Sequence, residues 1–183
     1  VDLIQGGAGT STNMNANEVI ANLGLAKMGY EYGQYSHLHP NNDVNRSQST
    51  NDVYPTAARL AIIFAAQPLK EAVAHLQHSL AAKGQEFSHV LKMGRTQMQD
   101  AVPMTLGQEF NAFASDLGGE TARIDHSCRQ LCEVNLGGTA IGTGINAPKG
   151  YANLAISELA DISGLRVRLA QDLVAASSDM GAF

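Results

Sequence analysis

Two long apolar stripes at helical spacing constrain the fold of this chain more than any other feature of its sequence. The first lies between Tyr54 and Lys92 and the second between Leu106 and about Asn135, with apolar residues mostly three or four positions apart. That spacing places them along one face of an α-helix. We therefore expect two long amphipathic helices, with Pro68 kinking the first or splitting it in two. Two such helices cannot bury both stripes alone, so we expect partner helices from further sequence or from other subunits.

The remaining segments also favour helices and loops. The pattern NANEVIANLGLAKM predicts a helix over Asn15–Met28, and a shorter helix is expected over Asn153–Ile162. Residues 29–52 are polar and rich in turn-forming residues, so they are expected to form a loop, and GLRVRLAQD is expected to be a connection. Because no alternation of apolar and polar residues persists, no strand is expected. The sequence thus predicts an all-α fold.

The composition excludes several classes of protein. Hydrophobic residues make up 44% of the 183 and charged residues 16%, which is typical of a globular chain. The net charge of −5 argues against a general nucleic-acid binder but leaves room for a small anionic substrate. No apolar run is long enough for a transmembrane helix and no signal peptide is visible, so we expect a cytoplasmic protein. Because the chain does not begin with methionine, we interpret it as a piece of a longer protein.

Four polar segments carry the candidate chemistry. The first three precede expected helices and are dense in hydroxyl and amide side chains: GGAGTSTNMN at 6–15, SQSTND at 47–52 and RTQMQD at 95–100. The fourth, GTAIGTGIN at 138–146, is a glycine-rich loop. A helix N-terminus presents free N–H groups and a positive partial charge, so it can bind a carboxylate or phosphate, while the side chains orient an ammonium or hydroxyl group. Short polar residues also cap helices, but a cap needs only one, and each of the first three segments has at least four hydroxyl, amide or carboxylate side chains.

Other motifs offer less. His75 and His78 could chelate a metal weakly, but they lack a third ligand, so we interpret them as exposed helix residues. His37 and His39 either contact an anion or belong to a surface turn. Neither a phosphate-binding GxxxxGK[ST] loop nor a GxGxxG motif after a strand occurs, which disfavours nucleotide-binding folds.

The polar segments and their neighbours resemble the aspartase/fumarase superfamily of lyases. The stretches GGAGTSTNMNANE, VNRSQSTNDVYPT, KMGRTQMQDAVPMTLGQE and EVNLGGTAIGTGIN follow that family's order and span nearly all of residues 5–150. The resemblance implies part of a long-helix bundle with ordered polar loops. Residues 1–52 would end an N-terminal domain that carries substrate-binding loops, and residues 53–183 would begin the central helical bundle. It also implies a homotetramer whose active sites are each assembled from three subunits, and a cofactor-independent anti elimination that yields fumarate.

Three local features resemble the aspartase branch of the superfamily more than the fumarase branch. The first segment contains GAGTSTNMN where fumarases resemble GSGTQSNMN, Thr50 stands where fumarases have serine, and Gln97 follows Thr96 where fumarases have histidine. The resemblance therefore implies elimination of ammonia from L-aspartate to give fumarate. The alternatives are a fumarate hydratase, another fumarate-releasing lyase, or a non-catalytic helical assembly module whose polar segments only cap helices.

The resemblance also implies roles for individual residues. Six of them would form the substrate pocket: Thr12, Ser49, Thr50, Asn51, Thr96 and Gln97. The first three would hold the β-carboxylate, where charge builds up in the aci-carboxylate intermediate once C3 loses its proton. Asn51 and Gln97 would orient the α-amino group, and Thr96 the α-carboxylate. HPNNDVN, residues 39–45, resembles a second, non-catalytic anion site of fumarases.

The family's catalytic base is a serine on a mobile loop of the form GSSxMPxKxNP. That pattern does not occur in residues 1–183, so we expect no catalytic base and no activity from this piece alone. We also expect no metal site, because His75 and His78 lack a third ligand. Within MGRTQMQDAVP, residues 93–103, we expect Gly94 to end one helix and Asp100 to cap the next, while Thr96 and Gln97 face the substrate.

Overall fold

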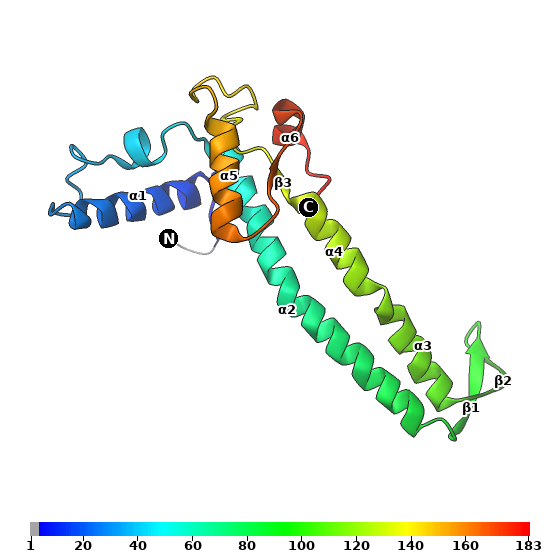
Figure 1. Cartoon of the computed structure of the whole chain (residues 1–183). Helices are drawn as coiled ribbons and strands as arrows, with labels where there is room; N and C mark the ends of the chain where they lie inside the picture. Colours follow the sequence, from blue (N-terminus) through cyan, green and yellow to red (C-terminus); the bar gives the residue numbers. More distant parts are fainter. Residues whose placement is uncertain (1–3) are drawn as a thin grey trace. The chain divides into compact units, whose positions relative to one another are not determined.

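In the computed structural model, which describes residues 4–183, the chain is predominantly helical (Figure 1). The helices are α1 (Thr10–Lys27), the short π-helix η1 (Pro40–Val44), α2 (Thr50–Glu86), α3 (Leu106–Gly118), α4 (Glu120–Leu131), α5 (Tyr151–Ser163) and α6 (Leu173–Ser178). The strands are β1 (Leu91–Thr96), β2 (Gln99–Thr105), β3 (Glu133–Val134) and β4 (Arg168–Leu169), in two two-stranded sheets. The prediction of a mainly helical fold is confirmed, whereas the expectation of no strands is wrong.

The chain forms two compact units, each described by itself below. The first unit combines the residues up to Ala61 with Gln130–Phe183, and the second unit is Ile62–Arg129. Helix α2 therefore contributes its first turns to the first unit and the rest to the second. The predicted domain division between residues 52 and 53 concerns a longer protein and stays a prediction.

In the second unit, α3 and α4 run alongside the later turns of α2 (Figure 1). The rings of Phe87 and Phe110 lie 5.6 Å apart, centre to centre. Farther along the unit, Lys70 Nζ lies 2.7 Å from a carboxylate oxygen of Asp125. The second long helix of the prediction is divided into α3 and α4 at Gly119, because two consecutive glycines have low helix propensity.

Helix α2 is a single helix of 37 residues, so the predicted split at Pro68 does not occur. Proline removes one helical hydrogen bond, the one to the carbonyl of Phe64. Because Phe64 is 54% exposed, water can reach this side of the helix. One lost bond is offset by the many others of so long a helix. The helix ends at Glu86, earlier than the predicted Lys92.

The third polar segment, expected to be a loop between helices, lies in an antiparallel hairpin of β1 and β2. Thr96 pairs with Gln99, so Gln97 and Met98 form a two-residue turn. Most hairpin side chains are exposed. A strand pair without a buried face needs no alternation of apolar and polar residues, which is why the sequence pattern does not reveal it.

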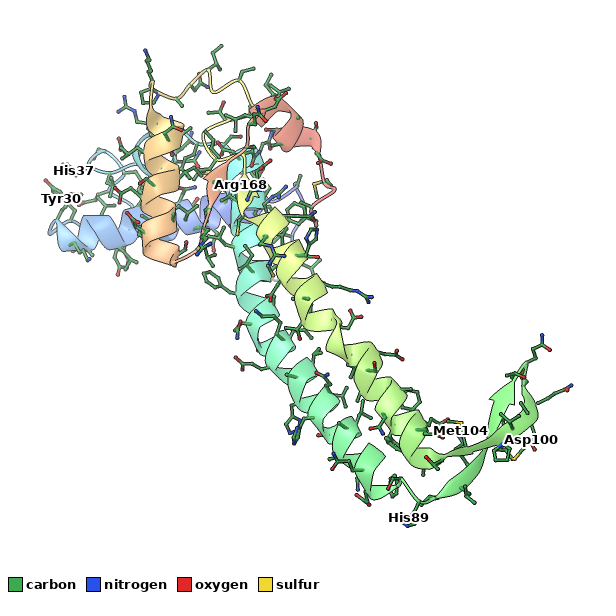
Figure 2. The ribbon with its side chains drawn as sticks, turned by 45° about the vertical axis from the view of Figure 1, so that its right-hand side comes forward. Tyr30, His37, His89, Asp100, Met104 and Arg168 are labelled. Atoms are coloured by element: carbon green, nitrogen blue, oxygen red, sulfur yellow. The ribbon has the colours of Figure 1, made fainter. Side chains whose placement is uncertain are left out.

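Two further expectations for this stretch are wrong. Gly94 lies inside β1 and ends no helix. Asp100 lies in β2 (Figure 2), and the residue that caps α3 is Thr105, whose hydroxyl accepts a hydrogen bond from the N–H of Gln108. The side chain of Gln108 accepts one from the N–H of Thr105 in return, which completes a capping box.

The close approach between α3 and the end of α2 depends on Gly107. A Cβ at this position would lie 2.3 Å from the carbonyl oxygen of Gly84 and 2.7 Å from Cα of Ser88, both of which are backbone atoms. We therefore expect Gly107→Ala to lower the free energy of unfolding by about 1–3 kcal/mol, measured by thermal unfolding of the longer protein. The control is Gly84→Ala, for which the three atoms nearest to the added Cβ all belong to the side chain of Asn111, which can move aside. Equal losses in the two variants would contradict this account.

The first unit has a small apolar core. Val134, Ile156 and Val167 are buried, and partly buried side chains of α2 and α5 pack against them. Strands β3 and β4 pair in parallel beside this core. The segment expected to be a plain connection, residues 164–172, therefore contains a short strand.

Apolar side chains of the long helices remain exposed. Ile62, Leu69 and Leu76 of α2 are 43%, 53% and 50% exposed, and Phe113 of α3 is 48% exposed. As predicted, the apolar stripes are not fully buried within residues 4–183. Of the helices in this range, none combines the length and the hydropathy needed to cross a membrane.

Candidate functional site

The first polar segment forms the N-terminus of α1. The helix begins at Thr10, five residues before the predicted Asn15, so Ser11 and Thr12 lie in its first turn. Gly9 precedes it in the left-handed conformation, with φ of 88°, and provides no side-chain cap. Within residues 4–183, the N–H groups of Ser11 and Thr12 have no hydrogen-bond acceptor. This helix end therefore offers two free donors to an anion.

A buried asparagine pair joins α1 to residues 45–50, which include the start of the second polar segment. Asn13 and Asn17 are 6% and 5% exposed. The Asn13 amide nitrogen donates to Thr50 Oγ1 at 3.0 Å, and that of Asn17 donates to Asn45 Oδ1 at 3.1 Å. The first and second segments are thus brought together by the bond between Asn13 and Thr50, and neither asparagine is among the six predicted pocket residues. The spacing of these two asparagines by one helical turn is the signal that could have identified them.

Asp52 joins the second polar segment to the fourth. Its carboxylate is fully buried and accepts three backbone hydrogen bonds: from the N–H of Ser49 at 2.9 Å, Thr139 at 2.8 Å and Gly137 at 3.1 Å. Burial raises the pKa of Asp52 above its ordinary value, and the three N–H groups oppose that rise. Sequence reasoning missed this residue because an aspartate near a helix start usually caps that helix.

Two amide side chains also connect the second polar segment to other parts of the first unit. The Asn51 side chain donates to the carbonyl oxygen of Ala140 at 2.8 Å. The Asn135 side chain, which belongs to a residue only 2% exposed, donates to the carbonyl oxygen of Asn51 at 3.0 Å and to Ser177 Oγ at 3.1 Å. The second segment, the fourth segment and α6 are therefore held together by side-chain hydrogen bonds.

The backbone of the fourth segment is tightly constrained. Thr139 adopts a positive φ of 59°, which is uncommon outside glycine. Gly142 has φ of 91°, and a Cβ there would lie 2.4 Å from the carbonyl oxygen of Leu173 in α6. The loop can keep this path only because its neighbours hold it in place.

Thr50 and Asn51 line a cavity of about 160 Å³ in the first unit, together with Arg59, Ser177 and Asp179. Arg59 is 7% exposed, and its guanidinium carbon lies 4.6 Å from the centre of the Phe183 ring. Burial lowers the pKa of Arg59, and the charges of Asp179 and Glu133 oppose that change. Arginine stays protonated under such shifts, so the cavity contains a permanent positive charge.

The third polar segment belongs to the second unit. Gln97 and Met98 have positive φ values of 48° and 61°. A two-residue turn of this kind normally uses asparagine and glycine. Two non-glycine residues in the left-handed region indicate local strain, which is found most often at functional sites. Thr96 and Gln97 lie in this exposed hairpin of the second unit.

The HPNNDVN stretch forms η1 and its cap. His39 Nδ1 accepts hydrogen bonds from the N–H groups of Asn41 and Asn42, both at 3.1 Å. The neighbouring His37 stacks on Tyr30 with ring centres 3.8 Å apart (Figure 2). Two N–H groups that an anion could use are thus bound by an imidazole, and an anion site here stays a prediction.

Comparison with known proteins gives a consistent picture. The sequence profile of a family described as lyase matches residues 1–183. The chain is 63% identical to an aspartate ammonia-lyase of Pseudomonas fluorescens and 53% identical to one of Escherichia coli K12; each match covers all of the chain and 38% of the relative. The chain thus spans less than two fifths of the length of these relatives.

Solved structures agree in fold. A fumarate lyase:delta crystallin from Brucella melitensis, bound to cobalt, superimposes with a TM-score of 0.92 at 57% identity, over 100% of this chain and 40% of that one. A class II fumarase from Schistosoma mansoni superimposes with a TM-score of 0.83 at 35% identity, over 92% of this chain and 39% of that one.

Proposed function

The chain belongs to the lyase family of the fumarase/aspartase superfamily, and from that premise we propose that the longer protein is an aspartate ammonia-lyase. It would convert L-aspartate to fumarate and ammonia. The observation that carries this proposal is the 63% identity to an aspartate ammonia-lyase over the whole chain, which includes all four polar segments. In the reaction a base takes the C3 proton, a double bond forms between C2 and C3, and the C2–N electron pair leaves with ammonia.

The hydroxyls of Ser49 and Thr50 suit the β-carboxylate. Thr50 Oγ1 accepts a hydrogen bond from Asn13, and Ser49 Oγ accepts one from the N–H of Asn51 at 3.2 Å. Because each oxygen already accepts a bond from the protein, its own O–H remains to be donated to a ligand. Together with the backbone N–H groups of Ser11 and Thr12, these hydroxyls would stabilise the negative charge that develops on the aci-carboxylate.

Asn51 is oriented to accept a hydrogen bond from the α-ammonium group. Its side-chain nitrogen is bound to the carbonyl oxygen of Ala140, which can only accept. The nitrogen must therefore face Ala140, and the amide oxygen is left for the substrate. An ammonium group can only donate, so this oxygen is the correct partner for it.

Thr96 and Gln97 complete the proposed site from the second unit of another subunit. We infer a homotetramer with shared active sites, in which residues 1–52 end an N-terminal domain and residues 53–183 begin the central bundle. The exposed apolar residues of α2 and α3 support such an assembly, because a bundle of subunits would bury them. The proposed reaction needs no cofactor, and the protein would act in the cytoplasm.

The longer protein is expected to release equal amounts of fumarate and ammonia from L-aspartate. Fumarate can be followed by its ultraviolet absorbance and ammonia by a coupled assay. Malate is the control substrate, because a fumarate hydratase would convert it to fumarate without ammonia. Conversion of malate but not of aspartate would overturn the proposal in favour of the hydratase.

A further inference from the structure

Two segments more than eighty residues apart in the sequence are joined by three side chains in the first unit. We call the side chains of Asn51, Asp52 and Asn135, with the bonds they make, the junction. Asp52 binds the N–H groups of Gly137 and Thr139, Asn51 binds the carbonyl oxygen of Ala140, and Asn135 binds the carbonyl oxygen of Asn51. The bonds thus run in both directions between residues 49–52 and 135–140.

Asp52 is the member of the junction with the most demanding environment. A buried carboxylate is costly unless its oxygens are hydrogen-bonded, and this one accepts one bond at Oδ1 and two at Oδ2. Asparagine at this position would be of similar size but would keep only one acceptor oxygen. Its NH₂ group would then face a backbone N–H that also donates.

The bonds of Asp52 control the path of a strained loop. Gly137 and Thr139, which it binds, have positive φ values of 92° and 59°. Thr139 immediately precedes Ala140, whose carbonyl oxygen orients the Asn51 amide. A shift of Thr139 would therefore turn the Asn51 side chain. Asp52, which is fully buried, could thus affect a pocket residue without reaching the pocket itself.

We propose that Asp52 is a positioning residue for the elimination: through Thr139 and Ala140 it fixes the orientation of Asn51 towards the substrate's ammonium group. This inference rests on the proposed function. In this proposal Asp52, which is fully buried, does not touch the substrate and acts only through the junction. A core residue affects the rate through the stability of the whole fold, whereas Asp52 would affect it through the orientation of one side chain, that of Asn51.

A double-mutant cycle in the longer protein tests this route. Asp52→Asn is expected to lower kcat about 10²-fold when Asn51 is present, since a small misplacement can cost that much. In an Asn51→Ala background the same change is expected to cost no more than about threefold, because the side chain that it positions is gone. A purely structural residue would instead reduce the active fraction by the same factor in both backgrounds. Equal losses would therefore overturn the proposal.

Ile156→Ala is the matched structural control. Ile156 is 8% exposed and belongs to the core, so its truncation lowers stability without touching the junction. It is expected to change kcat by the same factor in both backgrounds.

If Asp52→Asn does not fold, Asp52→Glu takes its place, because it keeps both acceptor oxygens but displaces them. Coupling to Asn51 is again expected, and equal losses in the two backgrounds again contradict the proposal.

The activity of the wild-type protein separates failure of the proposed function from failure of the positioning role. If it does not convert aspartate, the proposed function is overturned, and the same cycle is run with malate or whichever substrate the protein does convert. Malate carries a hydroxyl group where aspartate carries its ammonium group, and that hydroxyl can also donate to the Asn51 oxygen. Coupling between Asp52 and Asn51 would therefore still support the positioning of Asn51, and additivity would still overturn it.

Discussion

Thr50→Ala in the longer protein is expected to lower kcat for L-aspartate about 10²-fold or more, with a much smaller change in KM. The proposed role of Thr50 is to donate a hydrogen bond to the β-carboxylate, and this bond strengthens as charge develops after C3 loses its proton. Loss of one donor to a developing oxyanion typically has an effect of this size. Because the interaction is strongest in the transition state, kcat should fall more than KM rises. Initial rates of fumarate release over a range of aspartate concentrations measure both parameters.

Thr50→Ser is the matched control for this variant. Serine retains an oxygen that can accept the bond from Asn13 and a proton that can be donated to the substrate. It should keep most of the activity, whereas alanine also leaves the buried Asn13 amide without one of its acceptors. Thermal unfolding of both variants separates a loss of folding from a loss of catalysis. An unchanged kcat in Thr50→Ala would remove this hydroxyl from the charge-stabilising role.

Gln97→Gly is expected to stabilise the hairpin and to impair the enzyme. Gln97 holds a left-handed conformation that costs a non-glycine residue about 1 kcal/mol, so glycine should raise the free energy of unfolding by roughly that amount. If the amide orients the charged α-amino group, its loss should lower kcat/KM about 10- to 100-fold, as expected for a hydrogen bond to a charged group. Opposite signs for stability and activity would be typical of a residue kept strained for function.

Met98→Gly provides the comparison at the neighbouring turn position. Met98 has the same left-handed conformation and is 99% exposed, and no role in the site is proposed for it. Its replacement should stabilise the hairpin to a similar extent and leave the activity unchanged. Should both glycine variants retain full activity, Gln97 would have no part in substrate binding.

Much of the helical architecture could be predicted from the sequence, because helix formation leaves a local periodic signal. The stripe after Tyr54 predicts α2, and the stripe after Leu106 predicts α3 and α4, apart from the interruption at Gly119. The polar segments were also recognisable, since their density of hydroxyls and amides exceeds what helix capping needs. Membership of the lyase family follows from the same segments, and the match over residues 1–183 confirms it.

The hairpin could not be predicted in this way. Its strands bury no common face, so they leave no alternation in the sequence, and their pairing depends on backbone bonds between residues such as Thr96 and Gln99. The positive φ values of Gln97 and Met98 follow from the geometry of the turn. Neither residue is one that sequence rules assign to such a position.

The sequence by itself therefore determined the long helices and the family, because each depends on patterns of residues close together in the chain. The candidate pocket residues stay a prediction. Only the tertiary structure decided which polar residues act together. Asp52 could have been an ordinary cap until its carboxylate was found bound to Gly137 and Thr139, and Asn13 an ordinary helix residue until its amide was found at Thr50. A buried hydrogen bond between distant segments leaves no local pattern, since its partner is set by how the chain folds back on itself.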